Sequence, residues 1–269
     1  MSEFVHTPAH GYQIYRGIGT IPIASRPLTQ GGMGGMEIVL KHLETAVGMN
    51  SCKRGTVFHS VDVDSECQRV LVEHNPVHVF KDILSFLQLP VRLAVQRIMH
   101  ESGSEVQSLI QTSQEAQTNK EKQQAKDALK RVGESLLRSL MNCMDSFDDG
   151  DFFVEKTACA KHPGDPTKPC FVFTPSDQPG EQPEPDPKEY FMAGTSCTDW
   201  SSMGSGNSLA GHTVLPFAVE LQIIKRRKPR VFFHECTRNF RPQILGEYLE
   251  GTLAGFNLFF WVSSVSLNG

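Results

Sequence analysis

The sequence lacks any signal that would place it in or across a membrane. No apolar run is long enough to span a bilayer and no apolar leader opens the chain, so neither membrane insertion nor secretion is expected. The apolar stretch 256–267 has only the length of a buried strand. No internal repeat is evident, which argues against a repeat architecture.

A disulfide pattern and an excess of positive charge are also absent. The chain has seven cysteines, an odd number without regular spacing, which is typical of a reduced intracellular protein. The formal net charge of −4 argues against a uniformly basic nucleic-acid binder. A polyanion would have to meet a local patch, and the one dense basic run spans residues 225–228, followed by Arg230.

Helix and strand patterns alternate in the first third of the chain, after about thirty residues without clear periodicity. A glycine cluster at 31–35 leads into a helical pattern. A strand pattern (56–64), a helical pattern (65–75) and a second strand pattern (77–84) follow in order. This alternation predicts an α/β fold with a mostly parallel sheet.

The alternation stops at about residue 85. Long helical patterns follow, and one apolar stripe runs through Ala125, Leu129, Val132, Leu136, Leu137 and Leu140. After the helices, the proline-rich stretches 161–170 and 176–190 are typical of exposed loops or linkers. We interpret residues 85–188 as a helical and proline-rich insertion.

The α/β alternation returns near residue 190. The patterns predict a strand leading into the sequence GTSC, a helix over 214–228, a strand over 230–235, a helix over 242–256 and a terminal strand. The chain therefore divides into 1–84, the insertion 85–188, and 189–269, with the first and last parts forming one discontinuous domain.

Several residues with useful chemistry follow predicted strands. In open α/β sheets, ligands bind outside the carboxyl ends of the strands. The glycine cluster, Asp62, Asp82, Cys197 and Glu235 are all expected at that edge. Cys197 is the notable member because it lies in a run of Gly, Ser and Thr, where a thiol is accessible and free amides can lower its pKa.

Each of these residues also has a plainer interpretation. The glycine cluster could be a flexible loop, and Cys197 an inert buried thiol. Asp62 or Asp64 suits an acid that binds ribose hydroxyls, but either could be a solvated acid or a helix N-cap. Asp82 could pair with an adenine amino group or cap the next helix, and Glu235 could be a surface acid.

The sequence offers three of the four ligands that a zinc site needs. Cys159, His162 and Cys170 offer three soft ligands at irregular spacing, whereas a zinc site needs a fourth from elsewhere in the chain. We therefore assign no metal from the sequence.

The run GTSCTDWSSMG at 194–204 resembles the catalytic loop of the cytosine-5 DNA methyltransferases, in which Gly-x-Pro-Cys-Gln-x-Phe-Ser precedes a glycine. Gly194, Cys197 and Ser201 match that pattern. The later segment 228–235, with Lys-Pro, an apolar strand and Glu235, resembles the family's Glu-bearing strand. The resemblance covers about 30–84 and 190–269, and the chain stops before the segment where the family has its target-recognition domain.

The resemblance implies a Rossmann-like S-adenosylmethionine-dependent methyltransferase fold with a helical insertion. It assigns Gly32, Gly34 and Gly35 to the cofactor loop. It also implies that Asp62 holds the cofactor ribose and that Asp82, in a Lys-Asp-Ile sequence similar to the family's Gly-Asp-Ile, contacts adenine.

The implied reaction is methyl transfer to C5 of cytosine in DNA. Cys197 would add to C6 of a flipped base, and Glu235 would stabilise charge at N3. The protein would then be nuclear if its source is eukaryotic. Two alternatives share these residues: methylation of transfer RNA, and a catalytically inactive module that binds nucleotide or protein through the same fold.

Overall fold

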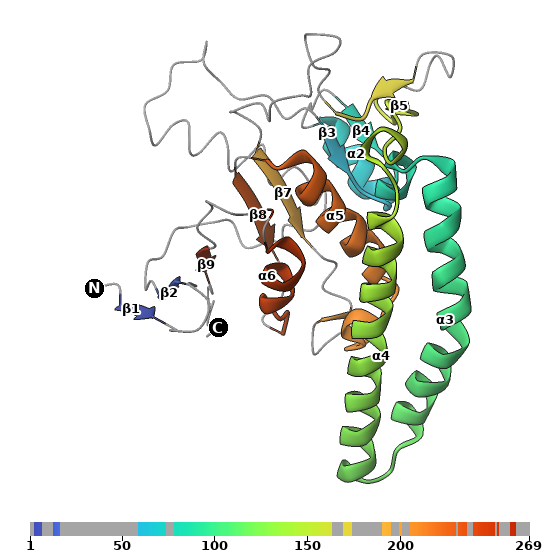
Figure 1. Cartoon of the computed structure of the whole chain (residues 1–269), viewed down its shortest axis with the longest axis vertical. Helices are drawn as coiled ribbons and strands as arrows, with labels where there is room; N and C mark the ends of the chain where they lie inside the picture. Colours follow the sequence, from blue (N-terminus) through green and yellow to red (C-terminus); the bar gives the residue numbers. More distant parts are fainter. Residues whose placement is uncertain are drawn as a thin grey trace.

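Helices dominate the described part of the chain, and short strands pair beside them (Figure 1). The computed structural model describes residues 3–6, 13–16, 59–73, 78–162, 169–173, 190–194, 199–200, 205–229, 231–235, 239–250, 252 and 259–261. This part has a mixed α/β structure. None of its helices carries an apolar stretch of the length and hydropathy needed to cross a bilayer.

Two long helices form an antiparallel hairpin. Helix α3 (Leu89–Glu115) begins with a proline in its first turn, and α4 (Asn119–Asp145) follows after a three-residue connection. Thr118 caps α4, because its Oγ1 accepts a hydrogen bond from the Glu121 amide at 3.2 Å while the Glu121 carboxylate accepts one from the Thr118 amide at 3.0 Å. The free end of the hairpin points away from the strands (Figure 1).

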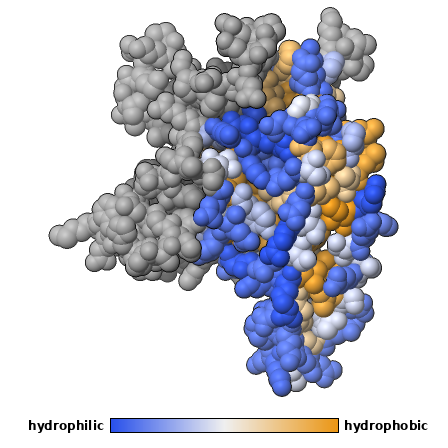
Figure 2. Space-filling model, viewed as in Figure 1, coloured by the Kyte–Doolittle hydropathy of each residue, from blue (hydrophilic) through white to orange (hydrophobic). Residues whose placement is uncertain are grey.

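The apolar stripe predicted along α4 is confirmed as the buried face of that helix, with Val132 partly buried beside it. On the outside, hydrophilic residues cover most of the visible surface. Hydrophobic residues gather near the start of α3 (Figure 2), where Leu89 and Leu93 are about half exposed.

The predicted strand–helix–strand units form two parallel strand pairs. Strand β3 (His59–Val61) pairs with β4 (His78–Phe80), and α2 (Ser65–Glu73) lies between them in sequence. Strand β7 (Tyr190–Gly194) pairs with β8 (Val231–Glu235), and the connection contains α5 (Val214–Arg227). Parallel neighbours need such crossovers, so these pairings agree with the predicted α/β class.

Three short elements depart from the sequence expectations. The weakly patterned start of the chain contains β1 (Glu3–His6) and β2 (Gln13–Arg16), which pair antiparallel, and β2 pairs parallel with β9 (Phe259–Trp261) of the predicted terminal strand. Helix α6 (Gln243–Leu249) is shorter than the predicted 242–256.

The residues next to the first proline-rich stretch form a short hairpin and contribute to the core. Strand β5 (Lys156–Thr157) pairs antiparallel with β6 (Cys170–Phe171). Val172 is fully buried, and the Phe173 ring lies 5.8 Å from the ring of Phe86 in the 3-10 helix η3 (Ile83–Phe86). Val172 lies between the two proline-rich stretches, 161–170 and 176–190, most of whose residues are outside the described part of the chain.

One hydrophobic core joins described segments on both sides of residues 85–188 to the helices between them. Its members come from β4, η3, α3, α4, α5 and α6. Helix α5 is central, since every residue from Phe217 to Ile224 is buried. Residues 85–188 are inserted in sequence order, yet their helix α4 packs directly on α5.

The short 3-10 helix after the Asp199 segment lies close against α4 at Gly133, and this contact can be tested by mutation. A Cβ added at Gly133 would lie 2.6 Å from the backbone nitrogen of Ala210, in the short 3-10 helix η6 (Ser208–Ala210). Gly133→Ala should therefore lower the free energy of unfolding by about 1–3 kcal/mol, as overpacking does. Gly103→Ala, with open space around its added Cβ, is the matched control.

The control should be neutral or stabilising by up to about 1 kcal/mol, because alanine has the higher helix propensity. Urea unfolding of both variants measures the difference. Equal stability of the two variants would contradict the close contact between α4 and η6.

Candidate functional site

The end of the β7–β8 pair forms the centre of the candidate site. The parallel register pairs Gly194 with Glu235, and these are the last residues of their strands. The loop that contains Cys197 starts from Gly194, so it leaves the sheet beside the backbone of Glu235. Cys197 itself lies outside the described residues.

The loop is anchored again two residues beyond Cys197. Asp199 is 1% exposed, and its carboxylate accepts hydrogen bonds from Ser205 Oγ (2.6 Å) and from both the amide (3.1 Å) and Oγ1 (2.6 Å) of Thr213. Thr213 is the N-cap of α5, where a negative charge is favourable. The neighbouring Trp200 is also buried, with its ring 4.9 Å from that of Phe240.

A buried acid and histidine hold the end of β8. His234 Nδ1 lies 2.6 Å from Oε1 of Glu220, which comes from the middle of α5, and both side chains are nearly inaccessible to solvent. His234 directly precedes Glu235. Helix α5 therefore fixes the position of the strand end that carries the candidate acid.

Asp62 extends the β3–β4 pair at its carboxyl end. Its amide donates to the carbonyl of Phe80 at 3.2 Å, and its Oδ1 accepts from the amide of Asp64 at 2.9 Å. Burial raises the pKa of the Asp62 carboxyl, although the Asp64 amide opposes this shift. The sequence left open whether Asp62 or Asp64 caps the next helix. Asp64 does so, because its Oδ1 accepts hydrogen bonds from the first amides of α2.

Asp82 follows β4 and caps the next helical turn. Its Oδ1 accepts a hydrogen bond from the amide of Leu84 at 2.9 Å, at the start of η3. Asp82 therefore caps the next helix, which is one of the two roles that the sequence allowed. A carboxylate has several acceptor positions, so this hydrogen bond does not prevent Asp82 from accepting another.

The predicted site residues thus fall into two described groups. Asp62 and Asp82 follow neighbouring parallel strands, and Glu235 lies at the end of β8 beside Gly194. The structure pairs the strands of each group, and the two pairs stand as separate sheets within the described residues. Gly32, Gly34 and Gly35 lie outside the described residues.

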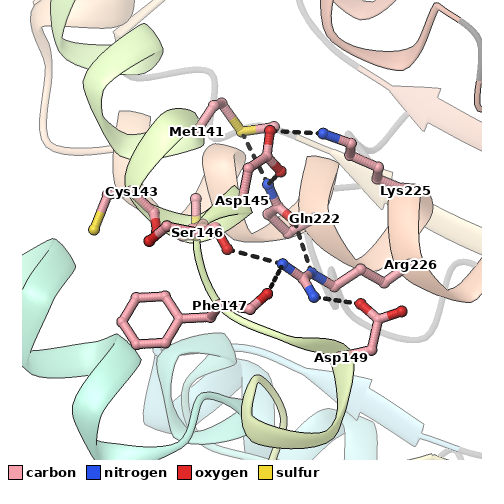
Figure 3. A network of polar contacts seen from close by, with 10 residues as sticks. Met141, Cys143, Asp145, Ser146, Phe147, Asp149, Gln222, Lys225 and Arg226 are labelled. Carbon is pink, nitrogen blue, oxygen red and sulfur yellow. Dashed lines mark hydrogen bonds and ion pairs between the residues drawn. The ribbon is translucent and has the colours of Figure 1, made fainter.

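Lys225 and Arg226, near the end of α5, are directed toward the end of α4 (Figure 3). Lys225 Nζ lies 2.7 Å from Oδ2 of Asp145. Arg226 pairs with Asp149, donates to the carbonyls of Met144 (2.8 Å) and Phe147 (3.1 Å), and has a side chain only 10% exposed. Residues 225 and 226 therefore fasten α5 to the end of α4, whereas Lys228 is exposed and Arg230 lies outside the described residues.

Burial and ion pairing act in opposite directions on Asp145. Burial raises its pKa, but the hydrogen bonds from Lys225 and Gln222 outweigh burial and hold the pKa below its usual value. Asp145 is therefore a carboxylate at neutral pH and remains available to both partners.

A second cluster of functional side chains lies at the opposite end of β4 from Asp82. His78, Cys159, His162 and Cys170 place one ligand atom each within 4.8 Å of one another. Sequence reasoning found the last three and missed His78, which lies far upstream in the chain and forms no motif with them. Burial and the nearby His162 lower the pKa of His78, so its imidazole is neutral at neutral pH.

Comparisons of the chain with protein-family models, curated proteins and solved structures find no match. The site is therefore interpreted from its own residues.

The buried pair behind β8 can be tested by removing one partner. Glu220→Ala takes away the carboxylate that meets His234 Nδ1, and breaking a buried pair in this way costs about 3–5 kcal/mol. Glu101→Ala, at an exposed position of α3, should change stability by less than about 0.5 kcal/mol. Thermal and urea unfolding measure both; a Glu220→Ala variant as stable as the control would contradict the contact.

Proposed function

We propose that this protein transfers a methyl group from S-adenosylmethionine to C5 of cytosine in DNA, through a covalent bond between Cys197 and C6 of the base. The observation that carries the proposal is the pairing of Gly194 with Glu235 at the ends of two parallel strands. It brings the start of the cysteine loop and the acid to one edge, although they are 41 positions apart in sequence.

The strand pairings also support a Rossmann-like sheet. In the doubly wound order 3-2-1-4-5, the second strand neighbours the third and the fourth neighbours the fifth. The pairs β3–β4 and β7–β8 fit those two neighbour relations in chain order. A first strand between them would have to come from residues 17–30, which lie outside the described residues, because β1 and β2 earlier in the chain pair with β9 in another sheet. The shared core packs on both pairs.

The anchored loop suits a nucleophile. Asp199 ties the chain just beyond Cys197 to the start of α5, and β7 fixes the chain just before it. A thiolate is a strong nucleophile near neutral pH, and fixed flanking residues reduce the entropy lost when it must meet one carbon of a base.

Cys197 and Glu235 have different roles in the proposed reaction. Cys197 adds to C6, which moves electron density toward C5 and N3, and Glu235 stabilises that charge by a hydrogen bond or proton at N3. When bound, S-adenosylmethionine would supply an electrophilic methyl group. Once C5 carries the methyl group, its proton passes to water, the C5–C6 double bond re-forms, and the bond from C6 to sulfur breaks to release Cys197 as a thiolate. The target base must leave the duplex for a thiol to reach its face.

The described acids fit the cofactor. A carboxylate at the end of β3 can accept hydrogen bonds from two ribose hydroxyls, and Asp62 occupies that place with its Oδ1 bonded only within its own turn. Asp82 lies at the end of the neighbouring strand, where an adenine amino group could donate to it.

Covalent trapping tests the nucleophile. In a DNA oligonucleotide carrying 5-fluorocytosine, the C5 fluorine cannot leave as a proton does, so the bond to C6 persists. With S-adenosylmethionine present, the wild type and a Cys143→Ser control should form a denaturant-resistant adduct, while Cys197→Ser should form none. An adduct in Cys197→Ser would remove the mechanism.

Substrate class is resolved in the same assay. An adduct with an RNA oligonucleotide and none with DNA would replace DNA by RNA as the substrate. Absence of adduct on both, with S-adenosylhomocysteine still bound, would support the inactive nucleotide-binding module instead.

The role of the acid is tested by Glu235→Gln. Removing a general acid lowers turnover by about 100- to 10,000-fold. Binding of S-adenosylhomocysteine and the unfolding midpoint should both stay as in the wild type. A large fall in the unfolding midpoint with little change in turnover per folded molecule would show that Glu235 is structural.

A further inference from the structure

Four potential metal ligands converge between β4 and the β5–β6 hairpin. His78 begins β4, Cys159 and His162 follow β5, and Cys170 begins β6. Cys170 Sγ and His162 Nδ1 are 3.3 Å apart, and all four ligand atoms lie within 4.8 Å of one another. We propose that these four residues bind a structural zinc ion, a site that does not depend on the proposed methyl transfer.

The spacing of the ligand atoms fits one tetrahedral ion. With zinc bonds of about 2.3 Å to sulfur and 2.0 Å to nitrogen, the corners of a tetrahedron are about 3.3–3.8 Å apart. The observed separations of the ligand atoms, none above 4.8 Å and one of 3.3 Å, are close to those values. The three local ligands come from one short segment, so a single contact with β4 completes the set.

The backbone around the cluster holds the ligands in position. The amide of Val79 donates to Sγ of Cys159 at 3.3 Å, which fixes the position of the sulfur beside β4. The amide of Ala160 donates to the carbonyl of Val79 at 2.7 Å, so the segment after β5 runs along β4. Such hydrogen bonds orient metal ligands from outside the coordination shell.

The chemistry of the ligands selects zinc. Two thiolates and two neutral imidazoles form a soft, tetrahedral donor set, which binds zinc in preference to magnesium or calcium. Two thiolate charges neutralise one divalent ion, so the filled site carries no net charge. With four protein ligands there is no open position for a substrate, and this is the arrangement of structural rather than catalytic zinc.

The ion would join two segments that are far apart in sequence. It would hold the β5–β6 hairpin against β4, the strand that leads to Asp82. Only two residue pairs connect β5 to β6, and so short a hairpin contributes little stability by itself. The proline-rich region thereby gains a fixed position beside the α/β core.

Metal content provides the first test. The full-length protein, purified from zinc-supplemented culture without chelator, should contain one zinc per chain by plasma mass spectrometry. Cobalt(II) in its place should give the intense visible bands of a tetrahedral thiolate site. Cys170→Ser should lose the metal, whereas Cys143→Ser and Cys67→Ser, whose thiols lie outside the cluster, should retain it.

A ligand at the surface keeps the test independent of folding. His162 is exposed, so His162→Gln should leave the secondary structure intact while zinc affinity, measured by chelator competition, falls at least about 100-fold. In the wild type, EDTA should lower the unfolding midpoint by about 5 °C or more, and zinc should restore it.

Three outcomes would overturn the proposal. The first is wild-type protein without zinc that shows no affinity for added zinc. The second is equal loss of metal from Cys143→Ser and Cys170→Ser. The third is a non-reduced peptide map in which Cys159 and Cys170 are joined by a disulfide in freshly purified protein, since a disulfide removes both thiolates.

Discussion

The burial of helix α5 is the constraint on which the other features depend. All of its residues from Phe217 to Ile224 are inside the core, where α5 packs between the hairpin helix α4 and strands β7 and β8. Its start is bonded to Asp199, its middle to His234, and its end to Asp145 and the residues that follow α4. A shift of α5 would therefore move the cysteine loop, the end of β8 and the hairpin together.

Polar groups along α5 explain why this helix has one position and not several. Apolar packing alone tolerates small slides, but a buried carboxylate or guanidinium without its partners is costly, so each polar contact fixes the helix along its axis. Arg226 shows this most clearly, because its guanidinium also lies 3.9 Å from the centre of the Phe152 ring. Arg226, which belongs to a basic run in the sequence, thus has a structural role in the fold.

The sequence predicts the local elements of this fold better than their assembly. The strands before Asp62, Asp82, Cys197 and Glu235, and the helices between them, follow from local periodicity, which depends only on neighbouring residues. The contact of α4 with α5 and the burial of Val172 depend on distant partners, so periodicity could not reveal them. His78 was missed for the same reason: a single histidine in a strand carries no spacing signal until the fold brings Cys159 beside it.

The proposed function requires the carboxyl ends of β3, β4, β7 and β8 to lie along one edge that binds the cofactor. Hydrogen exchange of the full-length protein with and without S-adenosylhomocysteine tests it most directly. We predict that the ligand slows exchange in the segments just after β3, β4 and β7 together. Binding that protects only other segments, or no binding at all, would contradict the claim.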